Sequence, residues 1–144
     1  MEYNNLILKE LSGKDADEIV FFAKQLNAAK SATELSGYLR EMFGINSYHC
    51  FGLYDNDKLL GISNGWVTVR FSSGRQLELD NVIVGSGRRS KGLGRKFLDL
   101  LENWAVQHSC KTIELNAYTQ NSRAHKFYYH SGYVILGFHF QKCL

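Results

Sequence analysis

Apolar residues recur with two different periods along the chain, and the change of period separates the predicted elements. A short apolar stretch at residues 6–11 predicts a first strand. Residues 12–26 and 31–44 then carry apolar side chains every three to four positions, which is typical of helices buried on one face. Ser12 or Asp15 could cap the first helix, and Gly44 suits the end of the second. The predicted apolar faces are Ile19, Phe22, Ala23 and Leu26 in the first helix, and Leu35, Tyr38, Leu39 and Met42 in the second.

The period shortens after residue 47. Residues 48–71 predict two strands joined by a turn at "DND", residues 55–57, and residues 75–84 predict a third strand after the turn "SSG". Helical spacing returns after residue 92, where Leu93, Phe97, Leu100, Leu101 and Trp104 form one stripe. Residues 111–118 predict a strand, residues 122–132 a short helix ending near Gly132, and residues 133–144 one or two final strands.

This order of elements predicts one domain over residues 1–144, because the chain contains neither a repeat nor a linker rich in Pro, Gly or Ser. The order is strand, two helices, three strands, helix, strand, helix and final strands. It predicts a mixed α/β fold (α+β) with a central sheet, mostly antiparallel at first and crossing over through helices later.

The composition indicates where in the cell the protein works and which kinds of site it can hold. The 144 residues are 44% hydrophobic and carry a net charge of +3, and five positive charges fall between Arg88 and Lys96. Cys50, Cys110 and Cys143 are odd in number and widely spaced, which argues against a disulfide framework or a zinc ribbon. The acidic and polar first residues, "MEYNNLILKE", lack the pattern expected of a signal peptide, and no apolar run approaches the roughly 18 residues of a membrane helix. We therefore expect a cytoplasmic protein with no membrane partner.

The segment "RRSKGLGRK", residues 88–96, places two glycines and several cations before a predicted helix. It fails the dinucleotide fingerprint, because Ser90 stands where a glycine is required, and it fails the Walker loop, because Leu93 stands where a lysine is required. The remaining pattern of strand, glycines and helix start can bind an anion, since the first turn of a helix has unpaired N–H groups and partial positive charge. The alternative is a basic surface turn.

Two motifs in the second half of the chain resemble those of one family. Arg89, Gly92 and Gly94 form R-x-x-G-x-G, and the downstream N-x-x-A-x-x-F-Y begins at Asn121, ends at Tyr128 and is followed by "HSGY". Over residues 77–144 the chain resembles the GNAT superfamily of acyl-CoA-dependent N-acyltransferases. The resemblance implies the GNAT-like fold, a mostly antiparallel sheet with splayed middle strands and about four helices.

The resemblance also implies acetyl-CoA, or another acyl-CoA, as co-substrate, without a metal. It places the pantetheine arm along one strand and beside Asn121, the pyrophosphate on the N–H groups of the glycine loop, and Tyr128 near the sulfur. The implied cofactor-binding residues are Val82, Ile83, Val84, Arg89, Ser90, Lys91, Gly92, Leu93, Gly94, Arg95, Asn116, Asn121 and Tyr128.

The implied reaction is direct attack of an amine on a thioester in a ternary complex. A lysine-like amine with a pKa of about 10.4 must lose a proton near pH 7, which requires a base or a route to water. Glu78 and Asp80 are the candidates, and in a regular strand they would share one face; both could instead merely face solvent. Tyr128 is the candidate acid for the leaving thiolate, or a core aromatic residue. Tyr129 points about 100° away on a helix and is a weaker candidate.

Several other functions can be weighed. His49, His108, His125, His130 and His139 lack a metal-binding spacing, and no Gly-x-Ser-x-Gly elbow supports serine chemistry. A nucleic-acid binder would need aromatic residues within the basic segment, which has none, so we do not expect the protein to bind nucleic acid. A non-catalytic acyl-CoA-binding regulatory domain remains an alternative.

The acceptor stays open between a small-molecule amine and a protein amine. The resemblance implies that the acceptor lies where two neighbouring strands separate, around residues 80–84 and 114–118. The chain could act as a monomer or a homodimer.

Overall fold

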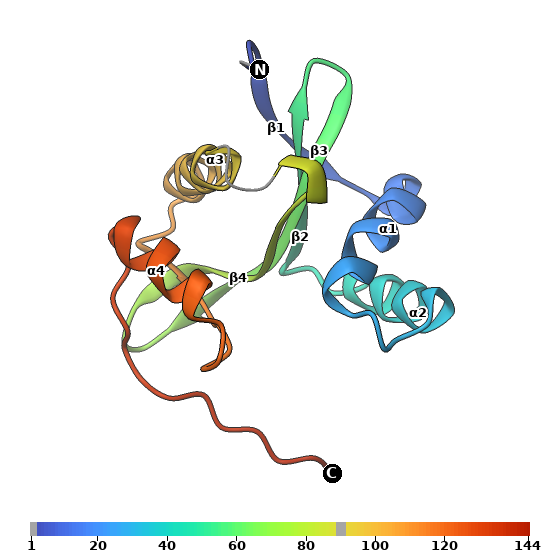
Figure 1. Ribbon diagram of the computed structural model, residues 1–144. Coiled ribbons are helices and arrows are strands. Elements are labelled where there is room, and N and C mark those ends of the chain that lie inside the picture. The colour runs from blue at the N-terminus through green and yellow to red at the C-terminus, as the bar shows by residue number, and fades with distance from the viewer. Residues whose placement is uncertain (1–2, 89–91) are drawn as a thin grey trace. The chain divides into compact units, whose positions relative to one another are not determined.

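The computed structural model describes residues 3–88 and 92–144, which divide into two compact units, Met1–Glu114 and Leu115–Leu144. The first unit holds a sheet with helices, and the second holds one helix and the C-terminal segment (Figure 1). The elements are β1 (Leu6–Leu11), α1 (Ala16–Leu26), α2 (Ala32–Phe43), β2 (Tyr48–Asp55), β3 (Lys58–Arg70), β4 (Gly74–Val84), α3 (Leu93–Gln107), β5 (Thr112–Leu115) and α4 (Ser122–His130), with short 3₁₀ turns η1 (Gly13–Asp15) and η2 (Ser86–Arg88).

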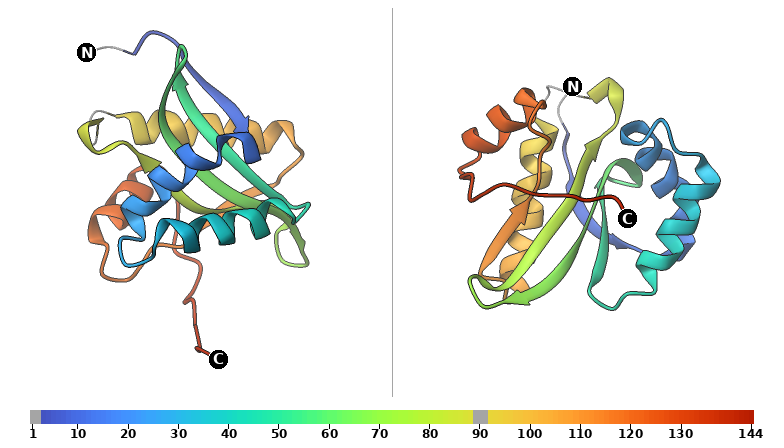
Figure 2. Two further views of the ribbon diagram at one scale, coloured as in Figure 1. Left: turned by 90° about the vertical axis from the view of Figure 1, so that its right-hand side faces the viewer. Right: turned by 90° about the horizontal axis from the view of Figure 1, so that it is seen from below.

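The sheet has the strand order β1-β2-β3-β4-β5, and the pairs β1–β2, β2–β3 and β3–β4 are antiparallel. The hairpin between β2 and β3 turns at Asn56 and Asp57, as the sequence predicts, and Asn56 adopts the left-handed conformation with a φ of 53°. β5 begins beside the start of β4, where the N–H of Lys111 donates to the carbonyl of Arg75 at 2.7 Å. Figure 2 shows β4 and β5 running in the same direction, with α3 as the crossover helix between them.

The sheet is covered on both faces within the first unit. Figures 1 and 2 show α1 and α2 on one face and α3 on the other. On the α3 face, the ring of Trp104 meets that of Phe51 at 4.8 Å. On the opposite face the buried cluster draws on α1, α2 and four strands, so it ties the two helices to the sheet. Its buried members are Leu11, Ile19, Val20, Phe22, Leu35, Leu39, Tyr48, Cys50, Ile62 and Ile83.

Capping boxes begin both helical segments of the first half. Ser12 accepts a hydrogen bond at the start of η1 while Asp15 bonds back to the Ser12 N–H, so the two predicted caps act together. Ser31 and Glu34 repeat this arrangement before α2, which satisfies N–H groups that a helix leaves unpaired. Gly44 ends α2, as predicted.

The second unit contains α4, and its ends follow the sequence prediction. The side chain of Asn121 caps the first turn by accepting from the N–H of Ala124 at 3.1 Å. Gly132 follows the helix with a φ of 88°, a conformation that glycine adopts without a steric cost.

The prediction of final strands over residues 133–144 is wrong, because the structure has neither helix nor strand there. Ile135, Phe138 and Phe140 are exposed. Their alternation suits a strand, but a strand also needs a partner to satisfy its N–H and C=O groups, and within the second unit this segment has none. Across the described ranges, no helix is long and apolar enough to cross a membrane.

Candidate functional site

A glycine in the left-handed conformation starts α3. Gly92 is the N-cap, with φ 75° and ψ 2°, and no side chain caps the helix. A Cβ atom placed on Gly92 would find no neighbour within 4 Å, so the approach to the helix start is open on the side of the described residues. The first intrahelical bond runs from the N–H of Lys96 to the carbonyl of Gly92, at 3.2 Å. The preceding N–H groups, from Leu93 to Arg95, are therefore available to an anion.

The residues around this turn differ in the groups that they can offer to an anion. Leu93 is 1% exposed and belongs to the core, so it can offer only its backbone. The guanidinium of Arg95 donates from Nε to Asp99 Oδ1 at 2.9 Å, which leaves its backbone N–H for a ligand. Gly94 lies in the first turn of the helix. Arg89, Ser90 and Lys91 lie outside the described residues.

The end of β4 leads to this turn. Val82, Ile83 and Val84 pair on one side with Ser63, Ile62 and Gly61 of β3. Ile83 is 3% exposed and points into the core, so any contact of this residue with a cofactor would use its backbone. β4 has 11 residues and β5 has 4, and the two strands start together. The C-terminal end of β4 thus extends beyond β5, and its backbone groups on that edge pair with no other described strand.

A β-bulge interrupts β4 at Asp80. Glu78 lies opposite Trp66 and Leu79 opposite Gly65, but the next pair joins Asn81 to Asn64, so Asp80 is the extra residue. A Cβ atom on Gly65 would lie 2.3 Å from the Glu78 carbonyl oxygen, so this close backbone approach requires glycine. The strand is not regular here, and the alternation that would place both carboxylates on one face is broken.

The two carboxylates have different surroundings. Glu78 Oε2 accepts from the Arg70 guanidinium at 2.8 Å, in a half-exposed ion pair. Asp80 Oδ2 accepts from the Asn81 amide at 2.9 Å. Desolvation raises the pKa of Asp80 above its ordinary value, and the charge of Glu78 acts in the same direction, while the Asn81 amide opposes both. Asp80 is therefore the better candidate for a base, because its carboxylate binds a proton more readily.

A polar network beside the bulge was not foreseen from the sequence. The Asn81 amide donates both to Asp80 and to Asn64 Oδ1, the latter at 3.3 Å, and the Ser63 hydroxyl donates to the Asn81 carbonyl at 2.5 Å. Ser63 and Asn64 are buried polar residues. The available signal was the polar pair "SN" within the apolar strand of residues 58–70, since buried polar groups need hydrogen-bond partners.

The second unit carries the remaining predicted residues. Tyr128 packs edge to face against Phe127 at 5.1 Å and Tyr133 at 5.7 Å, and burial raises its pKa. Tyr129 is 58% exposed, in agreement with the preference for Tyr128. Asn116 directly follows β5 and is not part of the strand. Asn121 uses its side-chain oxygen to cap α4, which leaves its amide N–H groups for another partner.

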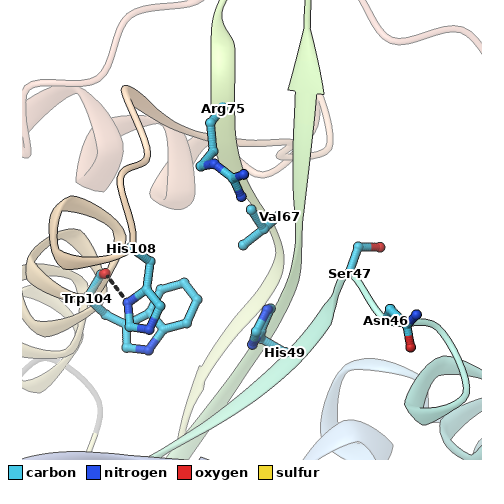
Figure 3. A pocket seen from close by; sticks show the side chains of 7 residues that line it. All are labelled: Asn46, Ser47, His49, Val67, Arg75, Trp104 and His108. Atoms are coloured by element: carbon cyan, nitrogen blue, oxygen red, sulfur yellow. Dashed lines mark hydrogen bonds between the residues drawn. The ribbon is translucent and has the colours of Figure 1, made fainter.

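A hollow of the first unit is lined by none of the predicted catalytic or cofactor-binding residues. It has a volume of about 220 Å³ and lies between the strands and the end of α3, as Figure 3 shows. His49 and His108 face it, and each has its Nδ1 bonded, to Glu10 at 2.7 Å and to the Trp104 carbonyl at 2.8 Å respectively. The lining residues are Asn46, Ser47, His49, Val67, Arg75, Trp104 and His108.

Three of the histidines have a hydrogen-bonded ring nitrogen in the described structure. His125 also bonds a backbone carbonyl, that of Tyr118, at 2.8 Å. Within residues 3–88 and 92–144, no three His, Cys, Asp or Glu side chains gather in a way that could hold a metal ion.

The mostly antiparallel sheet and the open glycine turn at the start of α3 fit the fold that the resemblance implies. Residues 19–133 match the model of the acetyltransferase (GNAT) family. The match covers most of the chain, so the protein belongs to this family. The resemblance in the sequence and the predicted fold class are confirmed.

Known proteins agree with this assignment. The uncharacterized N-acetyltransferase YhdJ of Bacillus subtilis (strain 168) is 29% identical over 97 residues, which are 67% of this chain and 68% of that protein. A GNAT family acetyltransferase of Staphylococcus aureus shares the fold with a TM-score of 0.78 and 20% identity, over 98% of this chain and 100% of that one. The aminoglycoside N-acetyltransferase AAC(6')-Iy, solved with CoA, shares it with a TM-score of 0.79 and 12% identity, over 96% of each chain.

Proposed function

We propose that the protein transfers an acetyl group from acetyl-CoA to a primary amine, by direct attack within a ternary complex. The observation that carries this proposal is the start of α3, where Gly92 in the left-handed conformation leaves an uncapped, open helix terminus at the end of β4. Such a terminus suits the pyrophosphate of CoA, because it offers several N–H groups and partial positive charge to one anion.

The donor would lie along the chain from β4 to the start of α3. Val82, Ile83 and Val84 would offer backbone groups to the pantetheine arm, and the N–H groups of residues 89–95 would bind the pyrophosphate. Asn116, Asn121 and Tyr128 of the second unit complete the proposed set. No metal ion is part of the proposal.

The chemical step needs two proton transfers. Asp80 accepts a proton from the acceptor ammonium, and the freed nitrogen lone pair attacks the thioester carbon. The carbon–sulfur bond then breaks, and the thiolate of CoA takes a proton from Tyr128. The proton that the nitrogen loses on forming the amide restores the tyrosine through solvent. Deprotonating a lysine-like amine at pH 7 costs about 4–5 kcal/mol, so a base with a raised pKa lowers the barrier.

Tyr128 is a weak acid for this role. With ordinary pKa values near 10 for the phenol and 8.5 for the thiol, the proton transfer is uphill by about 2 kcal/mol. Burial raises the pKa of Tyr128 and widens this gap. The transfer therefore depends on the thiolate being generated next to the hydroxyl, where the proton has a short path.

The acceptor is proposed only as an amine, either a small molecule or a protein side chain. One structural relative acts on aminoglycosides by its name, but at 12% identity it shows the fold and not this chain's acceptor. We propose the cytoplasm as the location, which agrees with the free thiols of Cys50, Cys110 and Cys143. A monomer or a homodimer would satisfy the proposed mechanism.

The test is the melting temperature with acetyl-CoA, CoA, ATP and NAD, each in separate excess. A ligand at about 100 times its Kd adds about 2.7 kcal/mol to the free energy of unfolding, which raises the melting temperature by several degrees. We expect this rise with acetyl-CoA and CoA but not with ATP or NAD. No rise with either CoA compound would contradict the donor site.

A panel of amines then separates the enzyme from a non-catalytic acyl-CoA-binding regulatory domain. The enzyme releases free CoA with at least one amine of the panel, and a thiol reagent detects it. A protein that binds acetyl-CoA but releases no CoA with any polyamine, aminoglycoside, amino acid or lysine peptide would favour the regulatory domain.

A further inference from the structure

Tyr48 carries a buried hydroxyl group that the described residues do not satisfy. The residue is 7% exposed, and its hydroxyl makes no hydrogen bond of ordinary geometry with them. Its ring is fixed by Phe43 at 5.2 Å and by Trp66 at 5.4 Å. Buried hydroxyl groups are nearly always bonded to protein or to water, so a water molecule is the expected partner of this one.

The hydroxyl lies on the same face of the sheet as the polar network at the bulge. Tyr48 stands opposite Trp66, and in the next row of that face Asn64 stands opposite Asn81. Asn64 lies beside the Tyr48 hydroxyl, and the charge of Asp80 acts on it. Asn81 in turn bonds both Asn64 and Asp80. One row of contacts thus leads from the unsatisfied hydroxyl to the proposed base.

We propose that Tyr48 and Asn81 are positioning residues for Asp80: the Asn81 amide fixes the carboxylate directly, and the Tyr48 hydroxyl, together with Asn64, holds a water molecule that bridges to it. This inference rests on the proposed function, in which Asp80 receives the proton of the acceptor amine. Asp80 itself is exposed, so water reaches the carboxylate from the solvent side.

The water completes a balanced proton path. The acceptor ammonium gives a proton to the water, and the water gives one of its own protons to the Asp80 carboxylate. The amine becomes neutral, the carboxylate becomes a carboxylic acid, and the water is regenerated. Tyr48 stays a neutral hydrogen-bond donor throughout, because burial raises its pKa far above the working range.

The polar and titratable groups of Asp80 and its neighbouring network come from three strands. Glu78 of β4 contributes a negative charge, which Arg70 partly neutralises. From β2 come Tyr48 and, beside it, Cys50, whose pKa burial raises to about 11, so both are uncharged near neutral pH. β3 contributes the neutral amide of Asn64. Hydrogen bonds from Asn81 and the bridging water therefore favour the ionised carboxylate, and the charge of Glu78 opposes it.

A ¹³C NMR titration of the Asp80 carboxyl carbon tests the proposal in the isolated protein. Asn81→Leu should raise the pKa of Asp80 by about 0.5–1 unit, the equivalent of one lost hydrogen bond. Tyr48→Phe should raise it in the same direction. Thr68→Val is the matched control, since Thr68 of β3 also carries a buried hydroxyl that makes no hydrogen bond with the described residues, and it should leave the titration unchanged. If the leucine side chain disturbs the bulge, Asn81→Ala serves as the test variant instead.

Stability and turnover separate positioning from a structural role. Tyr48→Phe removes a hydroxyl that no described residue satisfies, together with its one contact to the proposed water, so its melting temperature should stay close to that of the natural protein. With an amine found in the panel, its kcat should fall and the acid limb of the pH profile should move to higher pH. A titration identical to that of the natural protein overturns the role of the substituted residue. If the titration shifts but the protein turns over no amine, the substituted residue positions Asp80 as proposed, and the proposed function is wrong.

Discussion

At the residue scale, the surroundings of two neighbouring carboxylates decide their roles. Glu78 and Asp80 stand two positions apart, and the sequence alone treats them alike. Arg70 stabilises the charge of Glu78 through an ion pair, while desolvation raises the pKa of Asp80. Differing environments for like groups are a common basis of acid and base assignment. Neither the Arg70 partner nor the desolvation could be predicted, because both depend on strand pairing.

Replacing Asp80 by Asn should stabilise the protein at pH 7 while lowering its turnover. Since the folded-state pKa of Asp80 is raised, ionising it destabilises the fold at every pH above the folded value. Asn keeps the acceptor oxygen for Asn81 and carries no charge. The melting temperature of Asp80→Asn should exceed that of the natural protein at pH 7, and the difference should vanish below about pH 3.9, the ordinary value. A lower melting temperature at pH 7 would contradict the assignment.

Replacing Tyr128 by Phe should lower kcat by about 10–10³-fold with acyl-CoA binding retained, the range of a lost general acid. Because burial raises the pKa of Tyr128, the natural enzyme should show no alkaline limb from this residue below about pH 10. Steady-state kinetics from pH 6 to 10 and the melting-temperature rise with CoA measure both effects. Tyr129→Phe is the matched control on the exposed side of α4 and should be neutral. Unchanged kcat in Tyr128→Phe would remove the acid role.

At the element scale, the start of α3 could be predicted from the sequence and the bulge in β4 could not. A glycine before a helical stripe is a local signal, and Gly92 has the conformation that such a turn requires. The bulge depends on Gly65, on another strand, which lets the backbone at Glu78 approach closely. A sequence reader sees an alternating "LELD" and has no local reason to insert the extra residue.

Substitution of Gly94 tests the helix start as the pyrophosphate site. Gly94→Glu should abolish the melting-temperature rise caused by CoA, because a carboxylate in the first turn of α3 both fills the approach and repels the anion. Gly94→Gln is the isosteric control: it fills the same space without charge and should retain more of the rise. Calorimetric titration with CoA gives the same comparison as affinities. Full CoA affinity in Gly94→Glu would place the pyrophosphate elsewhere.

At the scale of the whole molecule, the order of elements from β1 to α4 follows the sequence pattern closely, since each is marked by period, caps or turns. Residues 133–144 are the exception. Their apolar alternation is typical of a strand, yet pairing is a property of two segments, and one segment cannot show its partner. The same reason shortens β5, which was predicted over residues 111–118 and spans Thr112–Leu115.

Amide hydrogen exchange tests this description of the C-terminal segment. No backbone hydrogen bond protects the amides from Val134 to Leu144 in the described structure, so they should exchange at nearly the rate of an unfolded chain. Amides in β2 and β3 should be protected by many orders of magnitude more, because they exchange only through opening of the sheet. Tyr133 is an internal reference, since its N–H donates to the Tyr128 carbonyl at 3.0 Å. Slow exchange at alternate residues of 134–144 would show that the segment pairs as a strand. That result would contradict the structure and support the sequence prediction.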